Sequence, residues 1–444
     1  MLKRIVFIAV LTGIGQIIAI FSIKFTSVLV SPQKLSSIAH IDALLSLLLS
    51  IIALGLQSSA MRNIALTTKW KEEYNTTQTA RFTLGLILFT LGTFLFVRWE
   101  YSFFFLAPLF AMSGDYALYA IGKPVTGAAI ACLRLTIPYG FMLIAARFKP
   151  EIVSYVFILS WAFVYLVTNT IISRALQVKS FYAPEWRSLK LYLQSLPLGI
   201  VSVSFYFLGI GVILIIPYFY PLAVETVAFI ALKFYVLFKG VLRIIHQAFF
   251  KEMINDSWCL KIDQLSILIA LLYLSSTLFF PNSFITFFSG KQYVGEKYFF
   301  LLLGISAVVY SMLLSCTTRA LLDVKDRPYT IITAIAALIT IISVIVLSYF
   351  NMALISIGVS ILVGEIFLLL GLRKISTIKN LMLPRLFFLF TNSSMLLIPY
   401  LFVRFFKDDL ITYIISTLTL ASVLFIINFK KFGFLYQDHV IDNN

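Results

Sequence analysis

The chain has 444 residues, of which 61% are hydrophobic and 12% charged, and its formal net charge is +16. These values, together with a mean hydropathy of +0.98, lie far outside the range of soluble proteins and exclude a soluble enzyme. The positive charge fits loop cations that face anionic lipid, so we expect no nucleic acid as a partner.

Apolar windows predict an all-α integral membrane protein with about 14 transmembrane helices, since about 20 residues cross roughly 30 Å of hydrocarbon. Lys3 and Arg4 precede the first apolar run. That run is too long for a secretory signal and has no small-residue cleavage site, so we expect it to remain as a helix. The predicted spans are 5–28, 41–61, 82–98, 101–121, 125–147, 152–173, 196–219, 222–246, 264–287, 298–319, 329–350, 352–372, 383–404 and 410–429.

The loop cations predict the orientation. If the N-terminus is cytoplasmic, loops on that side carry about 24 of the 35 Lys and Arg residues, and the opposite loops carry about 8. This asymmetry predicts that the N-terminus and the C-terminus both lie in the cytoplasm.

Two polar segments predict the domain organisation. The segment 174–194 contains Pro184 and fits a cytoplasmic linker with a short interfacial helix. Six predicted helices precede this segment. Six more follow it before the basic segment 373–385, which leads to a last pair of helices. We therefore predict an N-terminal six-helix lobe at 1–190, a C-terminal six-helix lobe at 191–380, and transmembrane helices 13 and 14 with a cytoplasmic tail at 381–444. Two such lobes with a site between them are typical of transporters.

Several absences argue against an enzyme. No predicted loop exceeds about 25 residues, which leaves no room for a soluble catalytic domain. No Gly-rich phosphate loop followed by Lys occurs. The cysteines have no paired spacing, and the histidines, which are His40, His246 and His439, have no neighbour that would make one a catalytic base. We expect no catalytic residue, no cofactor and no metal site.

Lys24, Arg134 and Lys233 lie deep inside predicted spans. A charge at mid-bilayer costs at least about 2.5 to 3.5 kcal/mol, so three such cations favour an anionic cargo. The alternative is that they pair internally. Under this alternative Asp42 neutralises Lys24, Asp115 meets Arg134, and Glu225 reaches Lys233 by way of another helix.

Polar side chains form one stripe on each of two predicted helices. The members on the first helix are Thr12, Gly13, Gln16, Lys24 and Ser27, and those on the eighth are Glu225, Lys233, Lys239, Gly240, Arg243 and Gln247. Arg319 shares a stripe with Ser311, Ser315 and Thr318 near a cytoplasmic end, where snorkelling explains it as well as binding of a headgroup does.

The chain resembles the Wzx-type polysaccharide flippases of the multidrug/oligosaccharidyl-lipid/polysaccharide (MOP) exporter superfamily, over nearly its whole length. The residues that carry the resemblance are Gly13, Gly15 and Gln16, the Leu54-Gly55-Leu56 turn with Arg62, the Pro197 start of the seventh helix, and the stretch from Phe288 to Tyr293. These patterns are loose, so the resemblance rests mainly on architecture and length.

The resemblance implies two six-helix bundles in a MATE-like V with alternating access, in the bacterial inner membrane. It implies that undecaprenyl-pyrophosphate-linked oligosaccharides, such as O-antigen units for lipopolysaccharide, move from the cytoplasmic to the periplasmic leaflet. A polysaccharide polymerase and a chain-length regulator are the implied protein partners. The first and eighth helices line the cavity in this family, so the substrate-binding candidates are Lys24, Lys233, Arg134, Gln16, Arg62, Arg243 and Arg319.

The coupling ion is less well defined. Carboxylates within the bundle are the expected carriers of a proton or Na⁺, and the candidates are Asp115, Glu365, Glu225 and Asp42. Multidrug members place an acidic residue within the first helix, and residues 5–30 have none. This departure favours an anionic lipid over a cationic drug. A multidrug exporter, a lipid II flippase and a membrane-embedded polymerase or acyltransferase are the alternatives.

Overall fold

The computed structural model describes residues 2–95, 104–250, 252–350, 353–375 and 382–428, and these ranges contain helices and no strand. The helices are α1 (Leu2–Leu29), α2 (Pro32–Ala53), α3 (Leu56–Leu66), α4 (Trp70–Leu95), α5 (Ala107–Ala111), α6 (Asp115–Ala120), α7 (Pro124–Phe148), α8 (Val153–Leu176), α9 (Lys190–Phe207), α10 (Ile216–Phe219), α11 (Leu222–Ala248), α12 (Asp256–Phe279), α13 (Pro281–Phe288), α14 (Lys297–Leu322), α15 (Asp326–Ser348), α16 (Ala353–Ile375), α17 (Met382–Ser393), α18 (Leu397–Phe405) and α19 (Leu410–Asn428).

The protein is a multi-pass membrane protein. In the described residues, 10 helical segments are long and apolar enough to cross a bilayer. The other predicted spans fall on α4, on α5 with α6, on α9 with α10, and on α11. The observed elements therefore agree with the prediction of about 14 spans.

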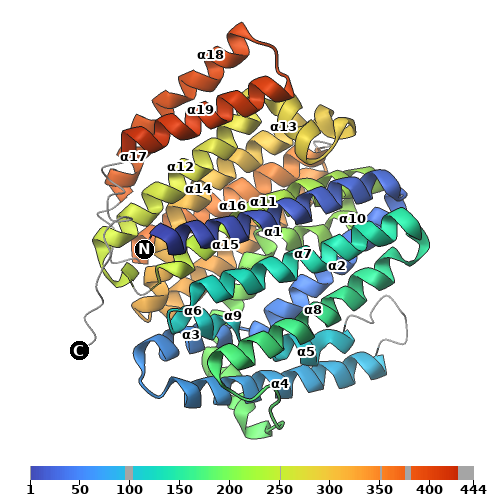
Figure 1. Ribbon diagram of the computed structural model, residues 1–444, viewed down its shortest axis with the longest axis vertical. Coiled ribbons are helices and arrows are strands. Elements are labelled where there is room, and N and C mark those ends of the chain that lie inside the picture. The colour runs from blue at the N-terminus through green and yellow to red at the C-terminus, as the bar shows by residue number, and fades with distance from the viewer. Residues whose placement is uncertain (1, 96–103, 251, 351–352, 376–381, 429–444) are drawn as a thin grey trace.

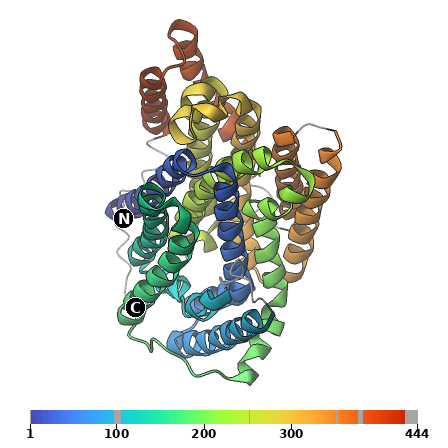
Figure 2. The same ribbon diagram turned by 90° about the vertical axis from the view of Figure 1, so that its right-hand side faces the viewer.

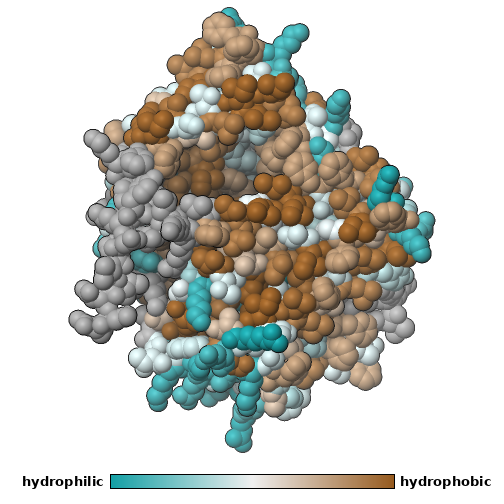
Figure 3. All heavy atoms as spheres, in the orientation of Figure 1, coloured by the Kyte–Doolittle hydropathy of each residue, from teal (hydrophilic) through white to brown (hydrophobic). Residues whose placement is uncertain are grey.

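Apolar side chains cover the outer surface. On α15, Ile331, Ile335, Leu338 and Ile342 are 41% to 56% exposed. Their spacing of three or four residues places them on one face of the helix. Figure 3 shows hydrophobic residues across much of the visible surface. A surface of this kind fits contact with lipid tails.

Several predicted spans contain breaks, among them the spans at 41–61 and 101–121. The span predicted at 41–61 bends at Leu54 and Gly55, where α2 ends and α3 begins. The continuous span predicted at 101–121 is wrong: residues 101–103 lie outside the described ranges, and the rest divides into α5 and α6. A Cβ added at Gly114 would lie 2.0 Å from the Tyr74 hydroxyl, so Tyr74 packs directly against the break. The Ser113 hydroxyl donates to the Asp115 carboxylate at 2.7 Å.

The last helices lie at one edge of the molecule. α17, α18 and α19 occupy the top of both ribbon views, where they pack against α12 and α13 (Figures 1 and 2). We call α1–α8 the first half and α9–α16 the second half. The domain boundaries at 190 and 380 remain predictions.

Buried apolar residues form two large clusters, and buried polar residues lie between them. In α1, for example, Ile8 belongs to one cluster and Ala19 to the other. Each of α7, α8, α11 and α16 likewise contributes residues to both clusters, one at either end of the helix. The buried polar residues between the clusters, which we call the polar layer, are Gln16, Arg134, Asn169, Lys239 and Glu365. A polar layer buried in a membrane protein is the usual location of a functional site.

Candidate substrate site between the two halves

Gly55 brings the backbones of the two halves together. It has φ +75°, in the left-handed region that favours glycine. A Cβ at Gly55 would lie 2.2 Å from the backbone nitrogen of Gly199 on α9. The α2–α3 bend therefore contacts the second half through backbone atoms.

Lys233 forms a buried ion pair between the halves. Its Nζ lies 2.6 Å from the Asp42 Oδ2 on α2, and the Tyr139 hydroxyl donates to the Asp42 Oδ1 at 2.5 Å. Asp42 is fully buried. The prediction that Asp42 neutralises Lys24 is therefore wrong, because the carboxylate is bonded to Lys233. Lys233 is also not the unpaired cation that the sequence predicts.

Lys239 and Glu365 form a second buried pair, within the second half. The Lys239 Nζ lies 2.6 Å from the Glu365 Oε1, and the same ammonium donates to the Leu208 carbonyl at 3.1 Å. The Tyr235 hydroxyl also donates to the Glu365 carboxylate. Glu365 thus has a cationic partner within hydrogen-bond distance.

The internal pair of Arg134 and Asp115 is present in the first half. Their nitrogen and oxygen atoms lie 3.0 Å apart. Arg134 Nε also donates to the Thr168 hydroxyl at 3.2 Å, and the guanidinium lies 4.3 Å from the Tyr165 ring centroid. These contacts favour a structural role for Arg134.

Lys24 links the halves at the face where α1 ends, which we call the Lys24 face. Its Nζ donates to the carbonyls of Thr286 at 2.9 Å and Phe287 at 2.6 Å, in the last turn of α13. A cation is favourable at the C-terminal end of a helix. The ammonium also lies within 5.9 Å of the ring centroids of Phe21, Phe25 and Phe287. A cavity of about 330 Å³ adjoins it, with Asp408 in its wall.

Glu225 also connects the halves near the Lys24 face. Its carboxylate lies 3.6 Å from His40 Nδ1 on α2. The predicted approach of Glu225 to Lys233 through another helix is not observed, since these residues have different partners.

Arg62 links the halves at the face where α1 begins, which we call the Arg62 face. Its Nη1 lies 3.2 Å from the Asp326 Oδ1 at the start of α15 and 3.4 Å from the Leu321 carbonyl. Arg319 lies in the second half, 3.3 Å from Asp256.

Gln16 and Arg243 lie where α1 and α11 meet. The side chain of Gln16 is buried, and its Oε1 has no hydrogen-bond partner in the described part of the chain. A Cβ added to Gly240 would lie 3.4 Å from the Gln16 Nε2, so α1 passes close to α11 at this point. Arg243 is exposed and lies three residues after Gly240 on α11.

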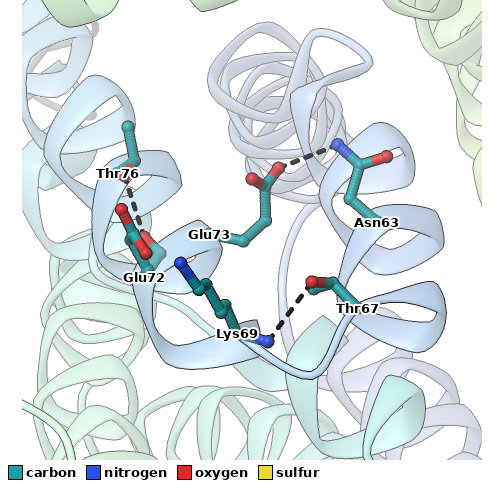
Figure 4. Close-up of a pocket in the computed structure, with 6 residues that line it drawn as sticks. All are labelled: Asn63, Thr67, Lys69, Glu72, Glu73 and Thr76. Carbon is teal, nitrogen blue, oxygen red and sulfur yellow. Dashed lines mark hydrogen bonds between the residues drawn. The ribbon is translucent and has the colours of Figure 1, made fainter.

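A separate cavity of about 400 Å³ lies between α3 and α4, and Figure 4 shows its polar lining. Asn63 donates to Glu73 there at 2.8 Å. Neither these two residues nor the rest of the lining belongs to the predicted site. The complete lining is Asn63, Thr67, Lys69, Glu72, Glu73 and Thr76.

The sequence analysis singled out neither member of a further buried ion pair. Asp263 on α12 and Arg385 on α17 lie 2.6 Å apart and are almost completely buried. Asp263 falls just before the span predicted at 264–287, and Arg385 falls in the predicted linker. The early start of α12 at Asp256 places Asp263 two turns inside the helix.

The fold is similar to that of solved MATE and MurJ structures, although no family model and no curated protein matches the sequence. A structure of the lipid II flippase MurJ in an inward closed conformation is 15% identical, with a TM-score of 0.65, and the match covers 96% of this chain and 99% of that one. A MATE in complex with MaD5 is 15% identical, with a TM-score of 0.55 and coverage of 85% and 97%. An outward-facing multidrug resistance MATE is 16% identical, with a TM-score of 0.52 and the same coverage. The similarity confirms the predicted all-α, MATE-like fold.

Proposed function

We propose that this protein is a flippase that moves undecaprenyl-pyrophosphate-linked oligosaccharide from the cytoplasmic to the periplasmic leaflet of a bacterial inner membrane. The proposal includes cytoplasmic termini and the two-lobe organisation predicted from the sequence. The substrate then passes between the halves by alternating access.

The observation that carries this proposal is the surplus positive charge where the halves meet. Each of three carboxylates, the buried Asp42 and Glu365 and the half-buried Asp115, has a cationic partner. Arg243 adds a further cation, with no ion pair to any described residue, and α1 contains no acidic residue. A guanidinium at this position suits a pyrophosphate, which it binds through two parallel hydrogen bonds.

The paired residues have a different part in this proposal. Lys233, Lys239 and Arg134 hold the helices that frame the site, whereas Arg243 and Gln16 contact the headgroup. Lys24 and Arg62 bridge the halves at the two faces and exchange partners as a face opens. A polymerase and a chain-length regulator remain proposed partners.

A lipid II flippase is the second candidate, because the MurJ match covers more of this chain than the MATE matches do. A cation-coupled multidrug exporter is less well supported, since the surplus charge at the junction would repel a cationic drug.

Reconstitution tests the proposal. Purified protein in liposomes should move a fluorescent polyprenyl-pyrophosphate glycan between leaflets, measured by the accessibility of the glycan to an added enzyme. Arg243→Ala should slow this movement roughly tenfold or more, because a hydrogen bond to a charged group contributes about 1.5 to 3 kcal/mol. Arg243→Lys should retain more activity than Arg243→Ala.

Arg404→Ala is the matched control, since Arg404 is exposed on α18, away from the junction. Equal transport by wild type and Arg243→Ala would contradict the proposed site. A preference for a glycan that carries a peptide would favour the lipid II candidate, and export of a cationic dye alone would support the drug exporter.

A further inference from the structure

Three ionisable side chains meet where α11, α12 and α17 pack together. His246 lies in the last turns of α11, Asp263 lies on α12, and Arg385 lies at the start of α17. All three are at most 3% exposed. They lie outside the junction that holds the proposed headgroup site.

Asp263 has one occupied and one free carboxylate oxygen. Its Oδ2 accepts from the Ser315 hydroxyl at 2.5 Å and lies 2.6 Å from Arg385 Nε. Its Oδ1 has no hydrogen-bond partner among the described residues. Arg385 also donates to the Ser315 hydroxyl.

His246 faces the free oxygen. Its Nε2 lies 3.0 Å from the Ser266 hydroxyl and 3.9 Å from the Asp263 Oδ1. Its Nδ1 has no partner in the described part of the chain. A buried imidazole with one free nitrogen can accept a proton, and a carboxylate oxygen nearby stabilises the resulting cation.

We propose that His246 and Asp263 form a proton-binding site in which His246 and Arg385 are alternative cationic partners of the carboxylate. In the described conformation Arg385 holds Asp263 and His246 is neutral. When Arg385 leaves, a proton from water binds His246, and the imidazolium donates to Asp263. The total charge of the cluster is conserved in this exchange, which avoids a stranded buried carboxylate.

The exchange connects proton binding to the position of α17. Because Arg385 is the residue of α17 that bonds to Asp263, its departure releases the start of α17 from α12 and α14. His246 is three residues from Arg243 on the same helix, so the site is also close to the proposed headgroup contact. The link to transport rests on the proposed function, whereas proton binding does not.

The other ionisable groups around Asp263 and Arg385 come from two helices. Cys259 lies on α12, and Cys316 and Arg319 lie on α14. Arg385 bonds to Cys316 Sγ at 3.4 Å, and Arg319 bonds to Asp256 at 3.3 Å. Asp263 is therefore the carboxylate that faces the imidazole.

Selective labelling tests the site directly, since the chain has only 3 histidines. Full-length protein with ¹⁵N in the imidazole rings is purified in lipid nanodiscs, and its spectra are recorded from pH 5 to pH 9. His246→Gln and His40→Gln assign the signals. The wild-type His246 signal should be that of a neutral ring at neutral pH. In Arg385→Gln it should become that of an imidazolium that titrates within this range.

Asp263→Asn in the Arg385→Gln background is the matched variant, and it should return His246 to the neutral form. A neutral His246 across the whole range in Arg385→Gln would overturn the proposal. An imidazolium that persists after Asp263→Asn would overturn it as well. If the double variant does not accumulate in the membrane, the His246 signal of Arg385→Gln alone tests the proposal.

Transport is measured separately. With the polyprenyl-pyrophosphate glycan, the wild-type rate should change with a pH gradient, and the rate of His246→Gln should not. If His246 titrates in Arg385→Gln but the wild-type protein moves no glycan, the proposed function is wrong and the proton-binding site stands. If the wild-type protein moves glycan but His246 stays neutral in Arg385→Gln, the proton-binding site is wrong and the proposed function stands.

Discussion

The ion pair of Lys233 and Asp42 joins helices from different halves at a distance of 2.6 Å. Both groups are buried, and Tyr139 supplies a further hydrogen bond to the carboxylate. Removing one member of such a pair leaves an uncompensated charge in a medium of low dielectric constant. Lys233 therefore contributes to folding as well as to the environment of the site.

Lys233→Met should lower the midpoint of thermal unfolding and the amount of protein in the membrane, since breaking a buried pair costs about 3 to 5 kcal/mol. The double variant Lys233→Met/Asp42→Asn should recover part of the loss. Lys291→Met is a control, because Lys291 is exposed. Fluorescence-detected gel filtration after heating measures all four proteins. A single variant as stable as wild type would show that the pair is not formed.

At the scale of the helices, the bend between α2 and α3 positions the first half against the second. It allows the first half to contact α9 through Gly55 and Gly199, and it directs α3 toward α15, where Arg62 meets Asp326. The geometry depends on a glycine with positive φ and on the absence of a side chain.

Gly55→Ala should sharply reduce the amount of folded protein, because the new Cβ would lie 2.2 Å from the Gly199 backbone and the φ of +75° disfavours alanine. Gly122→Ala separates the two effects, since Gly122 has φ +85° with nothing within 4 Å. Gly122→Ala should cost only about 1 to 2 kcal/mol. Equal abundance of the two variants would mean that the close contact does not form.

Much of this architecture was predictable because helix length and apolar character follow directly from composition along the chain. The resemblance named the turn at Gly55 but not its contact with α9, and the break at Gly114 was not predicted, since it depends on contact with Tyr74. The pair of Arg134 and Asp115 was found because both residues belong to neighbouring predicted spans. Lys233 with Asp42 was missed as a pair because its members are 191 positions apart, and a stripe on one helix does not reveal which residue of another helix faces it.

On the scale of the whole molecule, the excess of cations in alternate loops predicts which ends of the helices lie in the cytoplasm. Lys291→Cys should react with a membrane-impermeant maleimide in intact cells, and Lys179→Cys should react only after permeabilisation. Both residues are exposed, and the native Cys259 and Cys316 are buried. Labelling of Lys179→Cys in intact cells would reverse the proposed orientation.

The contacts that bridge the halves lie at both faces, Arg62 with Asp326 at one and Lys24 with the end of α13 at the other. In the proposed alternating access, opening either face would break one set and leave the other in place, so the two sets would oppose each other in a single equilibrium. Every 1.4 kcal/mol removed from one set changes the ratio of the two open forms about tenfold. The direction in which the molecule rests is thus a small difference between two groups of hydrogen bonds. Under this proposal, one substitution at Lys24 or at Arg62 should shift that bias without altering Arg243 and Gln16, the proposed headgroup contacts.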